Sequence, residues 1–141
     1  MISFHNQSIA FKFKGKTILK QWIKTVTEKE KHKLGTINYI FCTDDELLKI
    51  NIKHLNHNTL TDIITFDYTE GKTINSDIFI SIERVLENAE KFKVTFDEEF
   101  HRVMIHGILH LCGYKDKNKA DAELMRKKEN MALKLLKQGK L

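Results

Sequence analysis

The sequence predicts an α+β domain built around a small mixed β-sheet. Short extended segments and longer segments with helical periodicity are mixed along the chain, without the strict alternation of a fully parallel sheet. The 141 residues match the size of one ordinary domain and contain no linker, repeat or low-complexity block. We therefore expect a single domain over residues 1–141.

Short runs of alternating or continuous apolar residues predict the strands. In one of them, Ile37, Tyr39 and Phe41 share a face and Ile40 lies on the other. In another, Ile9, Phe11 and Phe13 alternate with other residues. The expected strands cover residues 2–13, 34–42, 62–66 and 77–81.

Apolar residues at helical spacing predict about five helices. Thr43 with Glu46, and Thr95 with Glu98, have the spacing of capping boxes, so a helix is expected after each threonine. Ser81 is expected to cap another helix. The helices are predicted over residues 16–31, 44–55, 82–92, 96–112 and 119–137. Their expected inner faces carry Leu48, Ile52 and Leu55 in the second helix, Val85, Leu86, Ala89 and Phe92 in the third, Phe100, Val103, Met104, Gly107, Ile108 and Leu111 in the fourth, and Leu124, Met131 and Leu135 in the last.

The charge balance is basic, with 24 Lys and Arg against 19 Asp and Glu and a net charge of +5. A basic surface suits a polyanionic partner, and RNA is the commonest one inside a cell. A composition rich in Lys, Ile and Asn, and without Pro, explains the charge equally well. The charge therefore supports an RNA partner without establishing one.

No segment predicts contact with a membrane. No window approaches the ~20 apolar residues that a spanning helix needs, and the first 16 residues lack the unbroken apolar stretch of a signal peptide. We therefore expect a cytoplasmic protein, in which Cys42 and Cys112 are reduced thiols.

The most informative segment is the end of the fourth predicted helix. His106 and His110 are four residues apart, so their side chains lie on one face, about one turn from each other. Gly113 tolerates the left-handed conformation that ends a helix, which lets the chain turn back and bring Asp116 to the same place. Two imidazoles and a carboxylate are an acceptable ligand set for zinc, and three ligands with an open position are typical of a catalytic site.

The spacing of these residues follows the metzincin metalloprotease layout, in which the third ligand is usually His. In that motif the residue after the first His is Glu, the general base. Gly107 stands there in this chain, so a standard zinc peptidase would lack its base. Bound zinc could still activate a water and polarise a phosphoryl or carbonyl oxygen.

Neighbouring residues are given other roles. Cys112 lies about 200° around the helix axis from His110, so we expect a small core residue there rather than a fourth ligand. His101 lies on a different helical face, and Tyr114 is expected to pack beside the turn. Lys115 is a candidate for contact with a substrate phosphate. The remaining histidines, which have no partner at ligand spacing, are expected at the surface or in turns: His5, His32, His54 and His57.

Residues 106–116 read His-Gly-Ile-Leu-His-Leu-Cys-Gly-Tyr-Lys-Asp. This segment resembles the signature of the YbeY endoribonucleases, His-Gly-x-Leu-His-Leu-x-Gly-Tyr-Asp-His, at every fixed position through Tyr114. Residues 61–66, Thr-Asp-Ile-Ile-Thr-Phe, resemble the family's Thr-Asp-Val-Leu-Ser-Phe segment, and residues 76–80 resemble its Gly-Asp-Ile strand. The resemblance covers roughly residues 34–130.

The resemblance implies a mixed sheet of about four strands and one zinc ion per chain at the end of a central helix. It carries His106 and His110 over as ligands and places Asp116 where the family has a third His. Two further departures concern substrate contacts. Lys115 replaces an Asp of the signature, and Leu55 stands where the family usually has an Arg that faces the RNA cleft.

The function that the resemblance implies is a zinc-dependent, single-strand-specific endoribonuclease. It would act in 16S ribosomal RNA 3′-end maturation and ribosome quality control, with ribosomal RNA and the small ribosomal subunit as partners. Two alternatives remain open. One is a metzincin-like zinc metallopeptidase, against which Gly107 argues. The other is a non-catalytic ribosome-binding zinc protein, which the loss of the Arg at Leu55 favours. The sequence names no general base and no oligomeric state.

Overall fold

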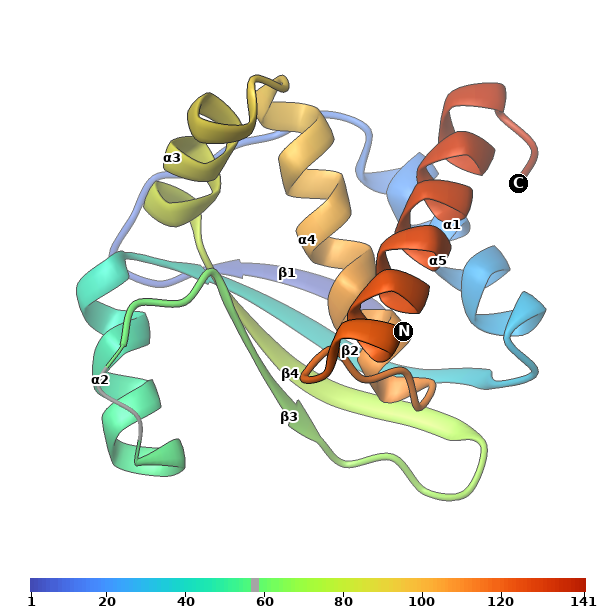
Figure 1. Cartoon of the computed structure of the whole chain (residues 1–141), viewed down its shortest axis with the longest axis horizontal. Coiled ribbons are helices and arrows are strands. Elements are labelled where there is room, and N and C mark those ends of the chain that lie inside the picture. The colour runs from blue at the N-terminus through green and yellow to red at the C-terminus, as the bar shows by residue number, and fades with distance from the viewer. Residues whose placement is uncertain (57–58) are drawn as a thin grey trace.

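The computed structural model describes residues 1–56 and 59–141, and the expected α+β architecture is confirmed. Within these residues, five helices accompany one four-stranded sheet (Figure 1). The elements in chain order are β1 (Ile2–Asn6), α1 (Lys16–Lys29), β2 (Lys33–Cys42), α2 (Asp44–Leu55), β3 (Ile63–Asp67), β4 (Thr73–Ser81), α3 (Ile82–Phe92), α4 (Phe96–Leu111) and α5 (Lys119–Gln138).

The sheet is mixed and has the strand order β1-β2-β4-β3. β1 pairs with β2, and β2 with β4, in parallel, whereas β3 runs antiparallel to β4. β1 and β3 are therefore the two edge strands, at opposite edges of the sheet. In the β3–β4 pair, Ile63 lies opposite Ile80, and Thr65 lies opposite Ile78.

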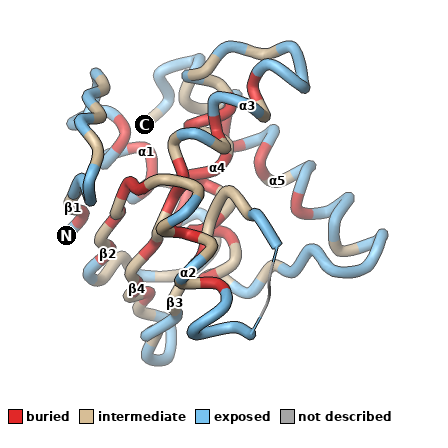
Figure 2. Tube along the Cα trace, turned by 90° about the vertical axis from the view of Figure 1, so that its left-hand side faces the viewer, coloured by how far each residue is buried: buried red, intermediate tan, exposed pale blue. Residues whose placement is uncertain are grey.

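The main core lies between one face of the sheet and α4. Alternate residues of β2 and β4 point toward this helix, and they include the fully buried Ile37, Tyr39 and Ile78. α1, α3 and α5 lie on the same side of the sheet as α4 (Figure 1). Figure 2 shows that buried segments concentrate along α4 and the middle of the sheet. The predicted inner face of α4 is confirmed, since its six stripe residues are all buried.

The other sheet face has a smaller core that α2 covers. Leu47 of α2 packs there against Cys42 and Ile64, with Phe66 and Phe79 at its margin. Both threonines cap their helices as predicted, but only the first of the two expected capping boxes is complete. Thr43 and Glu46 make a reciprocal capping box, and the Thr95 hydroxyl accepts a hydrogen bond from the Glu98 amide. These caps fix where α2 and α4 begin.

The predicted inner faces of three helices are wrong in part. In α2, Leu47 and Asn51 are buried, whereas Ile52 and Leu55 are exposed. In α3, Val85 and Ala89 are buried, but Leu86 and Phe92 are half exposed. In α5, the buried residues are Met125, Glu129, Ala132 and Leu133, while Leu124 and Met131 face solvent.

The expected strand over residues 2–13 is shorter than predicted, because β1 ends at Asn6. Phe11 and Phe13 lie beyond it and pack edge-on against Phe41 and Phe100. Their alternation therefore reflects burial in an aromatic cluster rather than strand pairing. No helix among the described residues is long and apolar enough to cross a membrane.

Candidate metal centre

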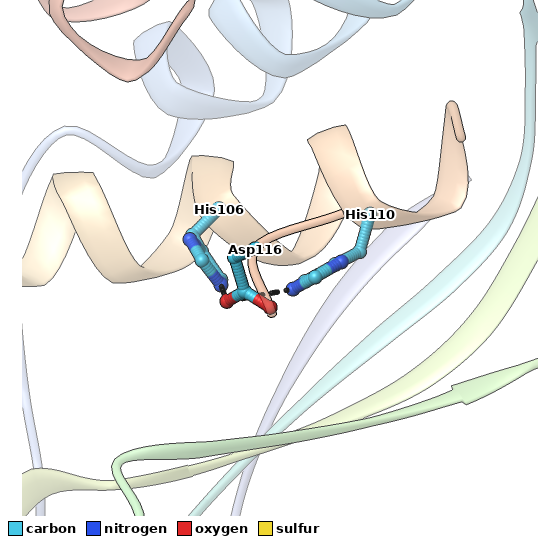
Figure 3. Close-up of side chains that lie close together, drawn as sticks. All are labelled: His106, His110 and Asp116. Atoms are coloured by element: carbon cyan, nitrogen blue, oxygen red, sulfur yellow. Dashed lines mark ion pairs between the residues drawn. The ribbon is translucent and has the colours of Figure 1, made fainter. Parts of the chain in front are cut away.

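The structure brings His106, His110 and Asp116 together at the C-terminal end of α4 (Figure 3). One ligand atom from each residue lies within 4.8 Å of the other two. The Asp116 Oδ2 atom is 3.2 Å from His106 Nε2 and 3.4 Å from His110 Nε2. Both imidazoles therefore point their Nε2 atoms at one carboxylate oxygen.

Local geometry explains how a helix and a loop converge on one point. His106 and His110 lie one turn apart on α4, with ring centroids separated by 4.5 Å. α4 ends at Leu111, and Gly113 then adopts a φ of 104°, in the left-handed region that favours glycine. The chain turns back there, so that Asp116 lies beside the two histidines. The predicted role of Gly113 is confirmed.

The second ring nitrogen of each histidine is held by an acceptor. His106 Nδ1 donates to Glu129 Oε2 at 2.6 Å, and His110 Nδ1 donates to the Tyr114 carbonyl oxygen at 2.8 Å. With the proton on Nδ1, each Nε2 presents its lone pair toward Asp116. Metal-binding histidines are commonly fixed in this way, by a carboxylate or a carbonyl behind the ring.

Glu129 is the centre of a buried charge cluster. Its side chain is only 5% exposed, and it accepts hydrogen bonds from Arg102 at 2.9 Å as well as from His106. Burial alone would raise the pKa of Glu129, but these hydrogen bonds hold it below its ordinary value. Burial would likewise lower the pKa of His106, but the bond to Glu129, with the charges of Asp116 and Asp62, raises it.

The donor set fits a zinc ion. Ligand atoms at about 2.0–2.1 Å from a tetrahedral zinc lie roughly 3.3–3.4 Å apart, and the distances from Asp116 Oδ2 to the two Nε2 atoms match this separation. Nitrogen and oxygen donors, with acceptors already behind both imidazoles, are the chemistry that such a site requires. Three ligands would leave the fourth position for water or substrate.

A cleft of about 770 Å³ opens in front of the triad, between edge strand β3 and the loop after α4. Lys115 and Lys117 lie on its rim, so Lys115 is placed where a substrate phosphate could reach it. Leu55 also lines the cleft, at the position where an Arg was expected by resemblance, and it offers only an apolar surface. The remaining lining residues come mainly from the segment 61–67.

The packing around Gly107 leaves no room for a glutamate general base directly after His106. A Cβ atom at this position would lie 3.0 Å from Ile63 Cδ1 and 3.3 Å from Ile78 Cδ1. The missing side chain therefore lets α4 approach β3 and β4 closely, and a longer side chain has no room there.

Asp62 supplies a carboxyl group on the cleft wall, and burial raises its pKa although His106 acts in the opposite direction.

The side chains of the other residues considered in the sequence make their contacts outside the triad, although the Tyr114 carbonyl holds His110. Cys112 packs at the edge of the main core, and burial raises the pKa of its thiol to about 12. His101 packs against Trp22 and Phe100, and burial lowers its pKa. Tyr114 packs beside the turn, as expected, and its hydroxyl donates to Glu30 at 2.6 Å. His57 lies outside the described residues.

Sequence reasoning missed Glu129 and Arg102. They lie 23 and four residues from His106, and no motif spacing links them to the histidine. Glu129 is the one charged residue on the buried face of α5, but the apolar pattern of the sequence did not identify that face. Glu129 can be buried because Arg102 and His106 donate hydrogen bonds to its carboxylate.

Comparison with known proteins places this geometry in a family. The family model described as Endoribonuclease YbeY matches residues 1–137. A curated relative named Endoribonuclease YbeY from Flavobacterium psychrophilum is 57% identical over 135 residues, which is 96% of each chain. A relative of the same name from Parabacteroides distasonis is 47% identical over 96% of this chain and 95% of its own. The solution structure of TM1509 from Thermotoga maritima is similar with a TM-score of 0.63 and 29% identity, covering 99% of this chain and 93% of that one.

Proposed function

The chain belongs to the YbeY family of endoribonucleases, and we propose that it cuts single-stranded ribosomal RNA with one zinc ion held by His106, His110 and Asp116. The role we infer is maturation of the 3′ end of 16S ribosomal RNA and ribosome quality control, in the cytoplasm. The observation that carries the proposal is the convergence of both Nε2 atoms on the Asp116 carboxylate at the base of the cleft.

Each group of the site has a stated task in this proposal. A zinc ion held by His106, His110 and Asp116 would polarise a phosphoryl oxygen and lower the pKa of a bound water. Glu129 and the Tyr114 carbonyl keep the two histidine rings oriented, with their Nδ1 protons held. Lys115 on the rim attracts the RNA backbone, and Asp62 provides a carboxyl group that can accept a proton in the cleft.

The open shape of the cleft favours unpaired RNA. Single strands can splay their bases and follow an irregular surface, whereas an A-form duplex is rigid and is read mainly through its wide minor groove. The cleft lies between strand β3 and the loop after α4, and the two histidines and Asp116 line it. Cleavage should therefore be faster on single strands.

The test is cleavage of a labelled single-stranded ribosomal RNA fragment by the wild-type protein and by a His110→Ala variant purified in parallel. The variant removes one imidazole donor and controls for contaminating ribonucleases. We expect the wild type to cut, a chelator to stop it, added zinc to restore it, and His110→Ala to be inactive. Equal cleavage by both proteins, or equal cleavage of the same fragment when annealed to its complement, contradicts the proposal.

The peptidase alternative is checked with the same preparations. Gly107 occupies the position of the missing base, and the packing against Ile63 leaves no room for a glutamate there. We therefore expect no chelator-sensitive cleavage of casein. The non-catalytic alternative predicts that the metal stabilises the protein without any RNA cleavage to lose.

A further inference from the structure

The positive charge of the chain is concentrated in one segment. Of the 24 basic and 19 acidic side chains, the first 27 residues contain five Lys and no acid, so the remaining residues carry 19 of each. The whole net charge of +5 therefore belongs to the part of the chain that ends within α1. We call the five residues the lysine face: Lys12, Lys14, Lys16, Lys20 and Lys24.

All five side chains are exposed, and three of them form a row. Lys16, Lys20 and Lys24 are four residues apart on α1, so they share one side of the helix and are separated by roughly 6 Å per step. Lys12 and Lys14 are exposed in the segment that precedes the helix. The neighbouring side of α1 is buried against the core through Leu19, Trp22, Ile23 and Val26.

The lysine face has no acidic partner among the described residues, where ion pairs involve other basic groups. Two of the lysines instead lie over aromatic rings. Lys16 Nζ is 5.2 Å from the Phe13 ring centroid, and Lys20 Nζ is 5.6 Å from that of Phe4. Such contacts hold a cation in place without neutralising it. The charges therefore remain available to a ligand.

The lysine face and the cleft lie at opposite edges of the sheet. The cleft is lined by edge strand β3, whereas Lys20 and Lys24 lie beside Ile2 of edge strand β1. The two regions are still part of one packed unit, because Tyr114 in the loop of the metal centre donates to Glu30 just after α1. Figure 1 shows α1 behind α5, away from β3. A polymer that enters the cleft could continue around the molecule to this face.

We propose that the lysine face binds the sugar–phosphate backbone of RNA outside the stretch that occupies the cleft. The inference rests on the proposed function in taking RNA as the substrate, and it adds a second contact surface to it. Phosphate contacts from lysine are independent of base sequence and position a nucleic acid rather than read it. The face would therefore strengthen binding of long, structured RNA without changing which bond is cut.

The surroundings favour RNA over other anionic partners. A helix that lies on a membrane needs an apolar face directed at the lipid, but the apolar side of α1 is buried in the core. A protein interface centres on buried aromatic or arginine anchors, and the exposed positions of α1 offer lysines and only one large apolar side chain, Ile18. A row of cations alone matches a phosphate backbone.

The test compares the triple variant Lys16→Gln, Lys20→Gln, Lys24→Gln with a control triple variant, Lys91→Gln, Lys127→Gln, Lys134→Gln. The control removes the same charge from exposed lysines elsewhere. Binding is measured in a His110→Ala background, so that the RNA stays intact, over a range of salt concentrations. The probes are a ribosomal RNA hairpin with a single-stranded tail and a short oligonucleotide that fills only the cleft. Thermal melting of each variant checks that it is folded.

We expect the lysine-face variant to lower the slope of log affinity against log salt by about two to three for the tailed hairpin, since each phosphate contact contributes about 0.7–0.9. The control variant should change this slope by less than one. With His110 intact, the rate of cutting the short oligonucleotide should be the same in all three proteins.

The outcomes separate the two proposals. If the wild type cuts RNA and the lysine-face variant binds the hairpin like the control, the lysine face is not an RNA contact, and the proposed function stands. If the wild type neither binds nor cuts RNA, both proposals fall. If vesicles of anionic lipid lose binding in the lysine-face variant while the hairpin does not, the surface serves a membrane, and the inference is wrong.

Discussion

The cleft of the candidate metal centre and the lysine face are two polar regions that differ in how their side chains are held. In the cleft, His106 and His110 each have one nitrogen held by an acceptor and the other directed at Asp116. On the lysine face, the charges rest beside aromatic rings or in solvent, without acidic partners among the described residues. The first region fixes the direction in which its ligand atoms point, whereas the second supplies only positive charge.

This difference follows from what each region has to do. A metal centre requires ligand atoms held within a narrow range of positions, so its side chains need their own hydrogen-bond partners. Attraction of a phosphate backbone depends on charge and distance and tolerates mobile side chains. Substitutions of the metal ligands and their hydrogen-bond partners should therefore have large and specific effects. Substitutions of lysines on the lysine face or on the rim of the cleft should have small and salt-dependent ones.

The largest effect is expected from Asp116→Ala. The variant removes the carboxylate toward which both Nε2 atoms point, so zinc affinity should fall by more than the 10–100-fold that loss of a supporting residue costs. Asp116→His is the matched variant, because imidazole is an equally suitable ligand and should keep zinc bound. Competition with a coloured zinc chelator measures both. Unchanged zinc affinity in Asp116→Ala would exclude this residue as a ligand.

A smaller effect is expected from Glu129→Gln. The amide can still contact His106 but carries no charge, so the histidine becomes a weaker and less firmly oriented ligand. Zinc affinity should fall by about 10–100-fold, with zinc-dependent cleavage falling alongside it. Glu123→Gln, at an exposed position of the same helix, is the control and should behave as the wild type.

The Glu129 comparison also separates orientation from stability. If Glu129→Gln lowered the melting temperature of the metal-free protein but left zinc affinity unchanged, the residue would serve the fold alone. The NMR signals of the His106 ring nitrogens provide a direct readout, since loss of the carboxylate should weaken the preference for the proton on Nδ1.

Gly107→Leu tests whether the cleft depends on the close approach of α4 to the sheet. The new side chain must displace Ile63 and Ile78, which should cost about 1–3 kcal/mol by overpacking, offset by up to about 1 kcal/mol from better helix propensity. Gly107→Ala should be nearly neutral, because its tightest contacts are with the Cδ1 ends of Ile63 and Ile78, and better helix propensity offsets the cost of shifting them. Chemical denaturation measures both variants, and equal stability of Gly107→Leu and the wild type would show that α4 can move away from β3.

The sequence predicts the fold class and the triad because both depend on local signals. The caps at Thr43 and Thr95, and the stop at Gly113, are short-range features that the structure reproduces. The predicted stripe of α4 is buried as expected, although Ile105 and Leu109 are buried as well and widen the inner face. The spacing of His106, His110 and Asp116 then follows from one helix and one turn.

The rest could not be predicted, because it depends on contacts between distant segments. In α2, apolar residues lie around most of the helix, so periodicity alone could not choose Leu47 over Ile52 as the buried residue. In α5, the buried face includes Glu129, whose burial depends on Arg102 and His106 of another helix. A hydrophobic pattern assigns a charged residue to the solvent side. The predicted buried face of α5 is therefore displaced by one residue from the observed one.

The smallest effect is expected from Lys115→Gln, which tests whether the cleft also uses charge in the manner of the lysine face. Lys115 is exposed on the rim and has no described ion pair, so its removal should not alter zinc affinity or stability. If it contacts one phosphate, the salt slope of RNA binding should fall by about 0.7–0.9, and KM should rise a few-fold while kcat stays the same. Steady-state kinetics on a single-stranded fragment at two salt concentrations measures this. A fall in kcat instead would show that Lys115 acts in the chemical step, as a fixed group of the cleft rather than as a mobile charge.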